Sequence, residues 1–329
     1  MRRPIVITSL AAGAVVILAL ASLLIGRVWV DPAQLLAAAM GDDRSLAGLI
    51  IWDLRLPRMV LALTMGAALG LSGAVLQGLT RNPLAEPGLL GVSSGAAFGA
   101  VMAIYFGLAT QLALAGPVAG IAGALGATAL TFALGRGGGT LVLILAGAAV
   151  SGLAAAGVSL ALNLAPNPYA AYEIMTWLMG SLVDRSWEQV VLVLPFIAAG
   201  CALLAVCGRG LDALSLGEAQ AASLGVDLGR LRLFALLGTA MAVGAATSVT
   251  GAVGFIGLVA PHIARPFVGH QPSRILLPSA LTGAALLLAA DVATRLFPTG
   301  PELKLGVLTG LIGTPFFFWL VVRLKRTAP

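Results

Sequence analysis

Long runs of apolar residues recur along almost the whole chain. They lie at 5–25, 59–79, 112–134, 141–164, 190–206 and 276–290, and they approach or reach the roughly 20 residues that a helix needs to cross about 30 Å of hydrocarbon. Their Ala, Leu and Gly residues follow no strict alternation, which argues against the strands of a transmembrane barrel. With 59% hydrophobic residues, 10% charged residues and a mean hydropathy of +1.03, the chain is predicted to be an all-α integral membrane protein.

The charges at the two ends of the chain set the number of spans. Hydropathy gives nine clear spans and a short doubtful one at 254–264, while basic residues stand at both termini: Arg2, Arg3, Arg323, Lys325 and Arg326. Basic residues collect on the cytoplasmic side of membrane proteins, so both termini are expected in the cytoplasm and the number of spans must be even. We therefore expect one transmembrane domain over 1–329 with about ten helices, the first of them an uncleaved span rather than a secretory signal.

Glycines recur at four-residue spacing inside the apolar runs. Small residues at this spacing allow helix backbones to approach closely in lipid, so we interpret these as packing residues: Gly66, Gly70, Gly91, Gly95, Gly99, Gly306 and Gly310. A loose echo of 55–58 and 72–75 in 230–232 and 250–253 is typical of the inverted repeats of transporters. Aromatic residues within 169–187 predict a short helix at the membrane surface.

Residues that could hold a nucleotide, a metal ion or a catalytic group are scarce. The only lysines, Lys304 and Lys325, lie outside any G-x-x-x-x-G-K-[ST] loop, so the chain is not expected to bind ATP itself. No metal-ligand cluster and no nucleophile with a base stands out, so no catalytic residue, metal or cofactor is expected in this chain and it is not expected to be an enzyme.

Charged residues are also scarce inside the spans, where proton or sodium coupling would need them. Asp291 and Arg295 lie four residues apart and are expected to pair with each other near the outer end of a helix. If the chain moves a substrate uphill, a partner is therefore expected to supply the energy. An ion-coupled secondary transporter and a channel or scaffold subunit stay open as alternatives.

One polar stretch, "SLGEAQAASLGVDLGRLR" at 215–232, interrupts the apolar runs. Ser215 and Glu218 have the S-x-x-E spacing of a capping box, and Gly225 stands where a glycine would end a helix of about nine residues. Asp227 is placed to cap the helix that follows. Because a helix this short is not stable alone in water, it must pack on something. That surface is either the chain's own helices or a cytosolic partner.

Several sequence blocks resemble the permease subunits of type II ABC importers for iron chelates, haem and cobalamin, the FecCD-type family. The resemblance runs from about Arg55 to Leu324. It is carried by "RLPR" at 55–58, "NPLAEPGLLGVSSGA" at 82–96, "GFIGLVAPHIAR" at 254–265 and "ELKLGVLTGLIGTPFFFWL" at 302–320. Lys304 departs from the proline that the family usually has after Glu-Leu.

The resemblance implies a homodimer in the bacterial inner (cytoplasmic) membrane, with two separate ATPase chains that hold ATP and Mg²⁺ and a periplasmic substrate-binding protein. It implies a coupling loop at about 209–229 that meets the ATPase through Gly217, Glu218, Ala221, Leu224 and Gly225. Docking to acidic residues of the binding protein is implied for Arg55, Arg58 and Arg295. Closure of the path on the cytoplasmic side is implied for Asn82, Leu84 and Thr140.

The function expected from the resemblance is that of a multi-pass permease subunit of an ATP-driven importer. It would move an iron complex, either haem or a ferric siderophore, or cobalamin from the binding protein to the cytoplasm. The lipid bilayer and a second copy of the chain are further expected partners, and nucleic acid is not.

Overall fold

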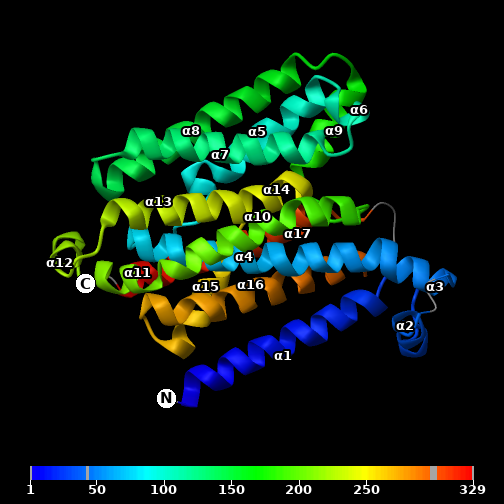
Figure 1. Cartoon of the computed structure of the whole chain (residues 1–329), viewed down its shortest axis with the longest axis horizontal. Coiled ribbons are helices and arrows are strands. Elements are labelled where there is room, and N and C mark those ends of the chain that lie inside the picture. Colours follow the sequence, from blue (N-terminus) through cyan, green and yellow to red (C-terminus); the bar gives the residue numbers. More distant parts are fainter. Residues whose placement is uncertain (1, 42–43, 297–301, 328–329) are drawn as a thin grey trace.

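The structure is a computed structural model that describes residues 2–41, 44–296 and 302–327. Within these ranges every regular element is a helix (Figure 1). The first part of the chain contains α1 (Arg2–Leu24), α2 (Pro32–Ala39), α3 (Leu46–Leu49), the π-helix η1 (Ile50–Arg55), α4 (Leu56–Thr80), the 3₁₀-helix η2 (Pro87–Leu90), α5 (Val92–Tyr105), α6 (Leu108–Gln111), α7 (Ala115–Gly135) and α8 (Gly139–Asn163).

The second part contains α9 (Pro168–Leu178), α10 (Trp187–Val206), α11 (Gly208–Leu214), α12 (Glu218–Ser223), α13 (Leu228–Thr239), the π-helix η3 (Ala240–Gly244), α14 (Ala245–Thr250), α15 (Ile256–Val268), α16 (Pro272–Arg295) and α17 (Leu305–Thr327). Within the described ranges no strand occurs, so the all-α prediction is confirmed there.

Six of the helical segments are long and apolar enough to cross a membrane. They are Leu46–Thr80, Ala115–Gly135, Gly139–Asn163, Trp187–Leu214, Leu228–Thr250 and Pro272–Arg295. Four shorter apolar helices accompany them: Thr8–Leu24, Val92–Tyr105, Ile256–Val268 and Leu305–Leu320. The doubtful segment at 254–264 thus forms a helix, although a short one. The chain is a multi-pass membrane protein.

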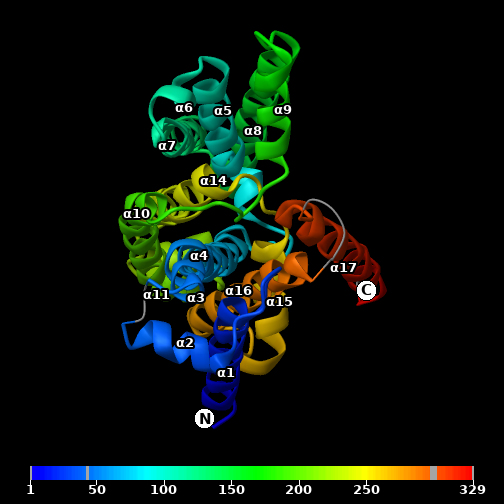
Figure 2. The ribbon, with the colours of Figure 1, turned by 90° about the vertical axis from the view of Figure 1, so that its right-hand side faces the viewer.

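The long helices lie side by side in one bundle with two distinct ends (Figure 1). Helix α12 lies at one end, where α1 begins and α17 ends, and we call this the α12 end. Helices α2, α3 and α6 lie at the opposite end, which we call the α2 end. In the view from the α2 end, α8 and α9 are separated from α17 (Figure 2). Helices α14 and α15 lie between them.

Glycines allow the central helices to touch through their backbones. A Cβ atom added to Gly66 on α4 would come 2.5 Å from the carbonyl oxygen of Gly283 on α16, and one added to Gly95 on α5 would come 2.6 Å from that of Gly123 on α7. No L side chain fits at such distances, so the packing interpretation is confirmed at these positions. At Gly310 a Cβ would have no neighbour within 4 Å in the described part of this chain, so a packing role there stays a prediction.

The π-helix η1 ends at Arg55, immediately before α4. Pro57 in the first turn of α4 has no N–H to donate to the preceding turn, which accounts for the local widening of the helix. The aromatic segment forms α9, which is capped by Asn167 through a hydrogen bond of 2.9 Å from the N–H of Ala170 to its Oδ1. The predicted short helix is therefore confirmed, while its position at the membrane surface stays a prediction.

Candidate docking and coupling sites

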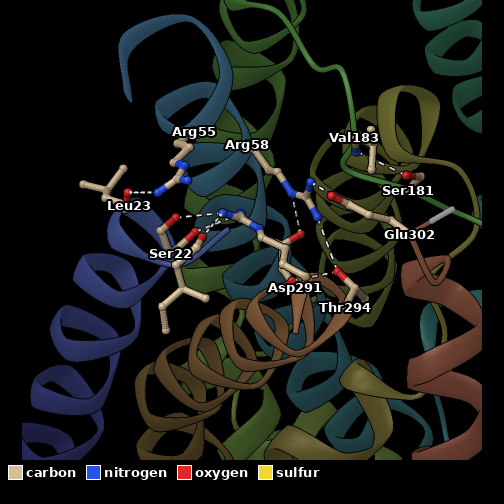
Figure 3. A network of polar contacts seen from close by, with 11 residues as sticks. Ser22, Leu23, Arg55, Arg58, Ser181, Val183, Asp291, Thr294 and Glu302 are labelled. Atoms are coloured by element: carbon tan, nitrogen blue, oxygen red, sulfur yellow. Dashed lines mark hydrogen bonds and ion pairs between the residues drawn. The ribbon is translucent and has the colours of Figure 1, made fainter. Parts of the chain in front are cut away.

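Three sequence-predicted arginines meet in a buried polar cluster near the α2 end of the bundle (Figure 3). Arg58 on α4 donates from Nε to Oδ1 of Asp291 on α16 at 2.8 Å, and from Nη1 to Oε2 of Glu302 at 3.0 Å. Its Nη2 donates to Oγ1 of Thr294 at 3.3 Å. The guanidinium of Arg58 thus has a partner on each of its three nitrogens.

Asp291 is the shared acceptor of this cluster. It has no exposed surface, and its second oxygen, Oδ2, accepts from Nη2 of Arg295. The predicted pairing of these two residues is therefore confirmed. Arg295 also donates from Nη1 to the carbonyl oxygen of Ser22 at 2.7 Å and from Nη2 to its Oγ at 3.0 Å. A buried carboxylate with two guanidinium partners ties α16 to α4, and Arg295 extends the link to α1.

Arg55 holds the end of α1 in a different way. It donates from Nη1 to the carbonyl oxygen of Leu23 at 2.6 Å (Figure 3). Its Nη2 donates to the carbonyl oxygen of Val28. These carbonyls lie at and just past the C-terminal end of α1, where no further turn of helix is present to bond them.

The three arginines are therefore packed side chains rather than free surface charges. Arg55, Arg58 and Arg295 are only 6%, 9% and 8% exposed. They nevertheless line one cavity of about 220 Å³ together with Asp184 and Glu302. The internal network accounts for their geometry without a partner, and docking to a binding protein stays a prediction.

A second cavity, of about 320 Å³, contains the residue that departs from the family pattern. Lys304 lines it with Arg185, Glu173 and Asp184, beside hydroxyl groups from the ends of α9 and α14. Burial lowers the pKa of the Arg185 guanidinium, and the charge of Asp184 opposes that shift. The cavity is polar and carries both signs of charge.

The polar stretch at 215–232 folds differently at its start from what the spacing predicts. Helix α12 begins at Glu218 after Gly217, whose φ of 118° is the glycine conformation that breaks the chain from α11. The predicted capping box is wrong, because Ser215 ends α11 and donates from Oγ to the carbonyl oxygen of Asp212 at 2.6 Å. The helix has six residues instead of about nine.

The end of the same stretch agrees with the sequence prediction. Gly225 has a φ of +83°, and its N–H bonds to the carbonyl oxygen of Ala222 at 2.9 Å. The N–H of Val226 donates to the carbonyl oxygen of Ala221 at 3.0 Å, which completes a Schellman motif. Asp227 caps α13 by accepting the N–H of Arg230 at 3.0 Å. Both local predictions are confirmed.

Helix α12 has one inward face and one outward face. Ala221 is fully buried against the bundle, while Leu216 and Leu224, just before and just after the helix, are 64% and 65% exposed. Large apolar side chains are thus exposed at the α12 end, and exposed apolar patches are typical of a surface that another protein covers. The burial of Ala221 shows that the chain's own helices hold α12, while packing against a cytosolic partner stays a prediction.

The predicted gate residues divide into two places. Asn82 accepts the N–H of Leu84 at 2.9 Å through Oδ1, which shapes the turn after α4. Thr140, in the first turn of α8, donates from Oγ1 to Oε1 of Glu218 at 2.8 Å. Among the described residues no hydrogen bond joins Thr140 to the Asn82 turn. The structure therefore brings one predicted gate residue to α12, the predicted coupling helix, and both roles stay predictions.

Sequence reasoning missed the partners that come from distant parts of the chain. Glu302 and Ser22 in the arginine cluster, and Arg232 beside Glu218, carried no local signal of these roles. The sequence signal that could have identified these partners is an isolated polar residue within an apolar run. In the part of the chain that the structure describes, no three His, Cys, Asp or Glu residues are grouped as metal ligands.

These features define a helical membrane protein with a charged cluster at one end and a short exposed helix at the other. The chain matches the FecCD transport family over residues 14–323 and belongs to that family. It is 40% identical over 282 residues to the hemin transport system permease protein HmuU of Yersinia pestis, covering 84% of each chain.

Other comparisons agree with this assignment. The chain is 38% identical over 309 residues to the vitamin B12 import system permease protein BtuC of Klebsiella pneumoniae, covering 92% of this chain and 89% of that protein. A solved structure described as an inward-facing metal-chelate type ABC transporter has a TM-score of 0.83 and 33% sequence identity. The match covers 97% of this chain and 99% of the other.

Proposed function

We propose that the chain is the transmembrane permease subunit of an ATP-driven importer. Family membership supports this assignment, and the single structural observation that carries it is α12. This helix is too short to be stable alone, its inner face is fixed to the bundle, and exposed Leu216 and Leu224 flank its outer face. A helix of this kind can bind a partner protein on its outer face and transmit the movement of that partner to the bundle.

The partner at α12 is an ATPase, and two copies of it serve two copies of the permease. ATP and Mg²⁺ are held by those ATPase chains and not by this one. The coupling element comprises Gly217, Glu218, Ala221, Leu224 and Gly225, within the loop at about 209–229, and Leu224 is exposed on its outer side. Closure of the ATPase dimer on ATP would displace α12 and, through the helices attached to it, the gate.

A periplasmic binding protein docks at the α2 end. The cavity that Arg55, Arg58 and Arg295 line would admit acidic side chains from its two lobes. The guanidinium groups are already held in place by Asp291 and by backbone carbonyls, so little side-chain entropy is lost when a carboxylate binds.

The topology follows from the position of α12. Because α1 begins and α17 ends at the α12 end, an ATPase at that end places both termini in the cytoplasm. The six long and four shorter apolar helices then make ten spans of the bacterial inner membrane. The path runs along the axis of a homodimer, and Asn82, Leu84 and Thr140 close it on the cytoplasmic side.

The substrate is a large iron complex or a corrinoid: haem, a ferric siderophore or cobalamin. The hemin and vitamin B12 permeases among the relatives support this class without choosing within it. We favour an iron complex. The direct test is to purify the cognate binding protein and identify the ligand it retains by absorbance and mass spectrometry. A ligand that contains neither iron nor cobalt would overturn the substrate assignment.

The alternative is an ion-coupled secondary transporter of a similar substrate. It predicts uptake into vesicles that needs no ATPase chain and stops when an ionophore collapses the ion gradient. The proposed importer predicts that uptake requires the ATPase chain and continues after an ionophore collapses the ion gradient. One set of vesicles therefore distinguishes the two functions.

A further inference from the structure

The carboxylate of Glu218 points toward the chain's own helices. Its Oε1 accepts from Oγ1 of Thr140 on α8 at 2.8 Å and from Nη2 of Arg232 on α13 at 3.0 Å. The side chains of Glu218 and Arg232 are 33% and 16% exposed, so the ion pair is partly shielded from water. One atom of α12 is thereby bonded to the beginnings of two long helices.

The surrounding charges favour this inward position. Arg81 follows the last residue of α4 as its C-cap, and its positive charge also acts on Glu218. The pKa of Glu218 lies below its ordinary value of 4.5, chiefly because the Thr140 hydroxyl donates to its carboxylate, with further contributions from Arg232 and Arg81. The folded protein therefore favours the ionised carboxylate of Glu218.

Besides these bonds, α12 is fixed to the bundle by its chain connections to α11 and α13 and by one buried side chain. Gly217 provides no side-chain cap at its start, and Ala221 is its only buried residue. A six-residue helix has no stability of its own. The bonds of Glu218 are therefore the polar connection by which a movement of α12 reaches α8 and α13.

We propose that Glu218 is a positioning residue that links α12 to α8 and α13, and that it does not contact the ATPase. In this account, which rests on the proposed function, Leu224 and its exposed neighbours bind the ATPase. Glu218 transmits the resulting displacement to Thr140 in the first turn of α8. The two faces of α12 thus have separable roles. The outer face binds the ATPase, and the inner face transmits the displacement to α8 and α13.

The chemistry predicts a graded series of variants. In Glu218→Gln an amide oxygen can still accept from Thr140, but the charge that attracts Arg232 is lost. Glu218→Ala removes both bonds, and Thr140→Val removes one bond at nearly constant shape. A suitable control is Ser159→Ala, because the Ser159 hydroxyl on the exposed side of α8 bonds only to the carbonyl oxygen of Ala155 within its own helix.

The test uses the complete importer, with ATPase and binding protein, in proteoliposomes. Three quantities are measured for each variant: ATPase retained during purification, ATP hydrolysis, and substrate transported per ATP. We expect Glu218→Ala and Thr140→Val to retain the ATPase and to lower transport per ATP by about tenfold, the effect of losing a hydrogen bond to a charged group. Leu224→Asp is expected to lose the ATPase, and Ser159→Ala to match the unmodified chain.

A double variant separates transmission from general damage. If Thr140 and Glu218 act through one bond, Thr140→Val adds no further loss in the Glu218→Ala background. Release of the ATPase by Glu218→Ala, or unchanged transport per ATP in both single variants, would overturn the proposal. An unmodified chain that retains no ATPase would instead contradict the proposed function, so the two failures are distinguishable.

Discussion

Arg58 and Asp291 form an ion pair of 2.8 Å between α4 and α16, although 233 positions separate them in the chain. The same carboxylate accepts from Arg295, so a single buried acid pairs with two guanidinium groups, and Glu302 supplies a second negative charge to Arg58. This relationship joins the two central helices near the α2 end, where docking of a binding protein is proposed.

Replacing Asp291 with Asn is expected to destabilise the fold strongly. The two buried arginines would lose the carboxylate that they share, leaving Glu302 as the acid paired with Arg58. Breaking a buried ion pair in this way costs about 3–5 kcal/mol. Thermal unfolding of the purified chain in detergent measures the loss. The control, Asp227→Asn, changes an exposed acid to an equally good helix cap and should alter stability by less than about 0.5 kcal/mol. Equal unfolding temperatures for the two variants would refute the role of Asp291.

Glycine-to-alanine substitutions test the backbone contacts. Gly66→Ala places a methyl group 2.5 Å from the carbonyl oxygen of Gly283 and should destabilise the chain by about 1–3 kcal/mol through overpacking. Gly310→Ala meets nothing within 4 Å and should be neutral or slightly stabilising, since alanine favours a helix. Both variants can be compared by unfolding in detergent. A neutral Gly66→Ala would mean that α4 and α16 do not pack as described.

The corrected start of α12 makes a separate prediction. Asp227→Ala removes the cap of α13 and should cost about 1 kcal/mol of local stability, whereas Ser215→Ala should cost less than about 0.5 kcal/mol because no capping box exists. Hydrogen exchange of the Arg230 and Ala221 amides reports the two helix starts. Faster exchange throughout α12 in Ser215→Ala would show that the capping box forms after all.

Acid should loosen α12 through Glu218. Because its folded pKa is lower than its ordinary value of 4.5, its stabilising contribution is complete above that value and is lost as the pH falls through the lower folded pKa. Amide protection in α12 should therefore hold constant down to about pH 5 and decrease in more acidic buffer. The Glu218→Gln variant should lack this acid step. Finding the same step in that variant would assign it to another group.

The predictions that succeeded rest on local chemistry. Gly225 ends α12 and Asp227 caps α13 because each needs only its immediate neighbours along the chain. The capping box failed because Gly217 adopts a left-handed conformation that separates Ser215 from the helix, and a spacing rule cannot detect that.

The contacts that could not be predicted join distant segments. Thr140 meets Glu218 across 78 positions, and Arg58 meets Asp291 across 233. In a chain of repeated Ala, Leu and Gly runs, periodicity identifies the helices but not which of them are neighbours. The family resemblance named Arg58 and Glu218 as functional, and only the structure supplies their partners inside the chain.

Uptake by the reconstituted importer shows whether ATP hydrolysis drives transport through this chain. Proteoliposomes that contain this chain and its ATPase, with the loaded binding protein outside, are compared with matched vesicles whose ATPase binds ATP but cannot hydrolyse it. ATP-driven import predicts that substrate accumulates only with the hydrolysing ATPase and that an ionophore does not reduce the accumulation. Accumulation that persists without ATP hydrolysis would contradict it.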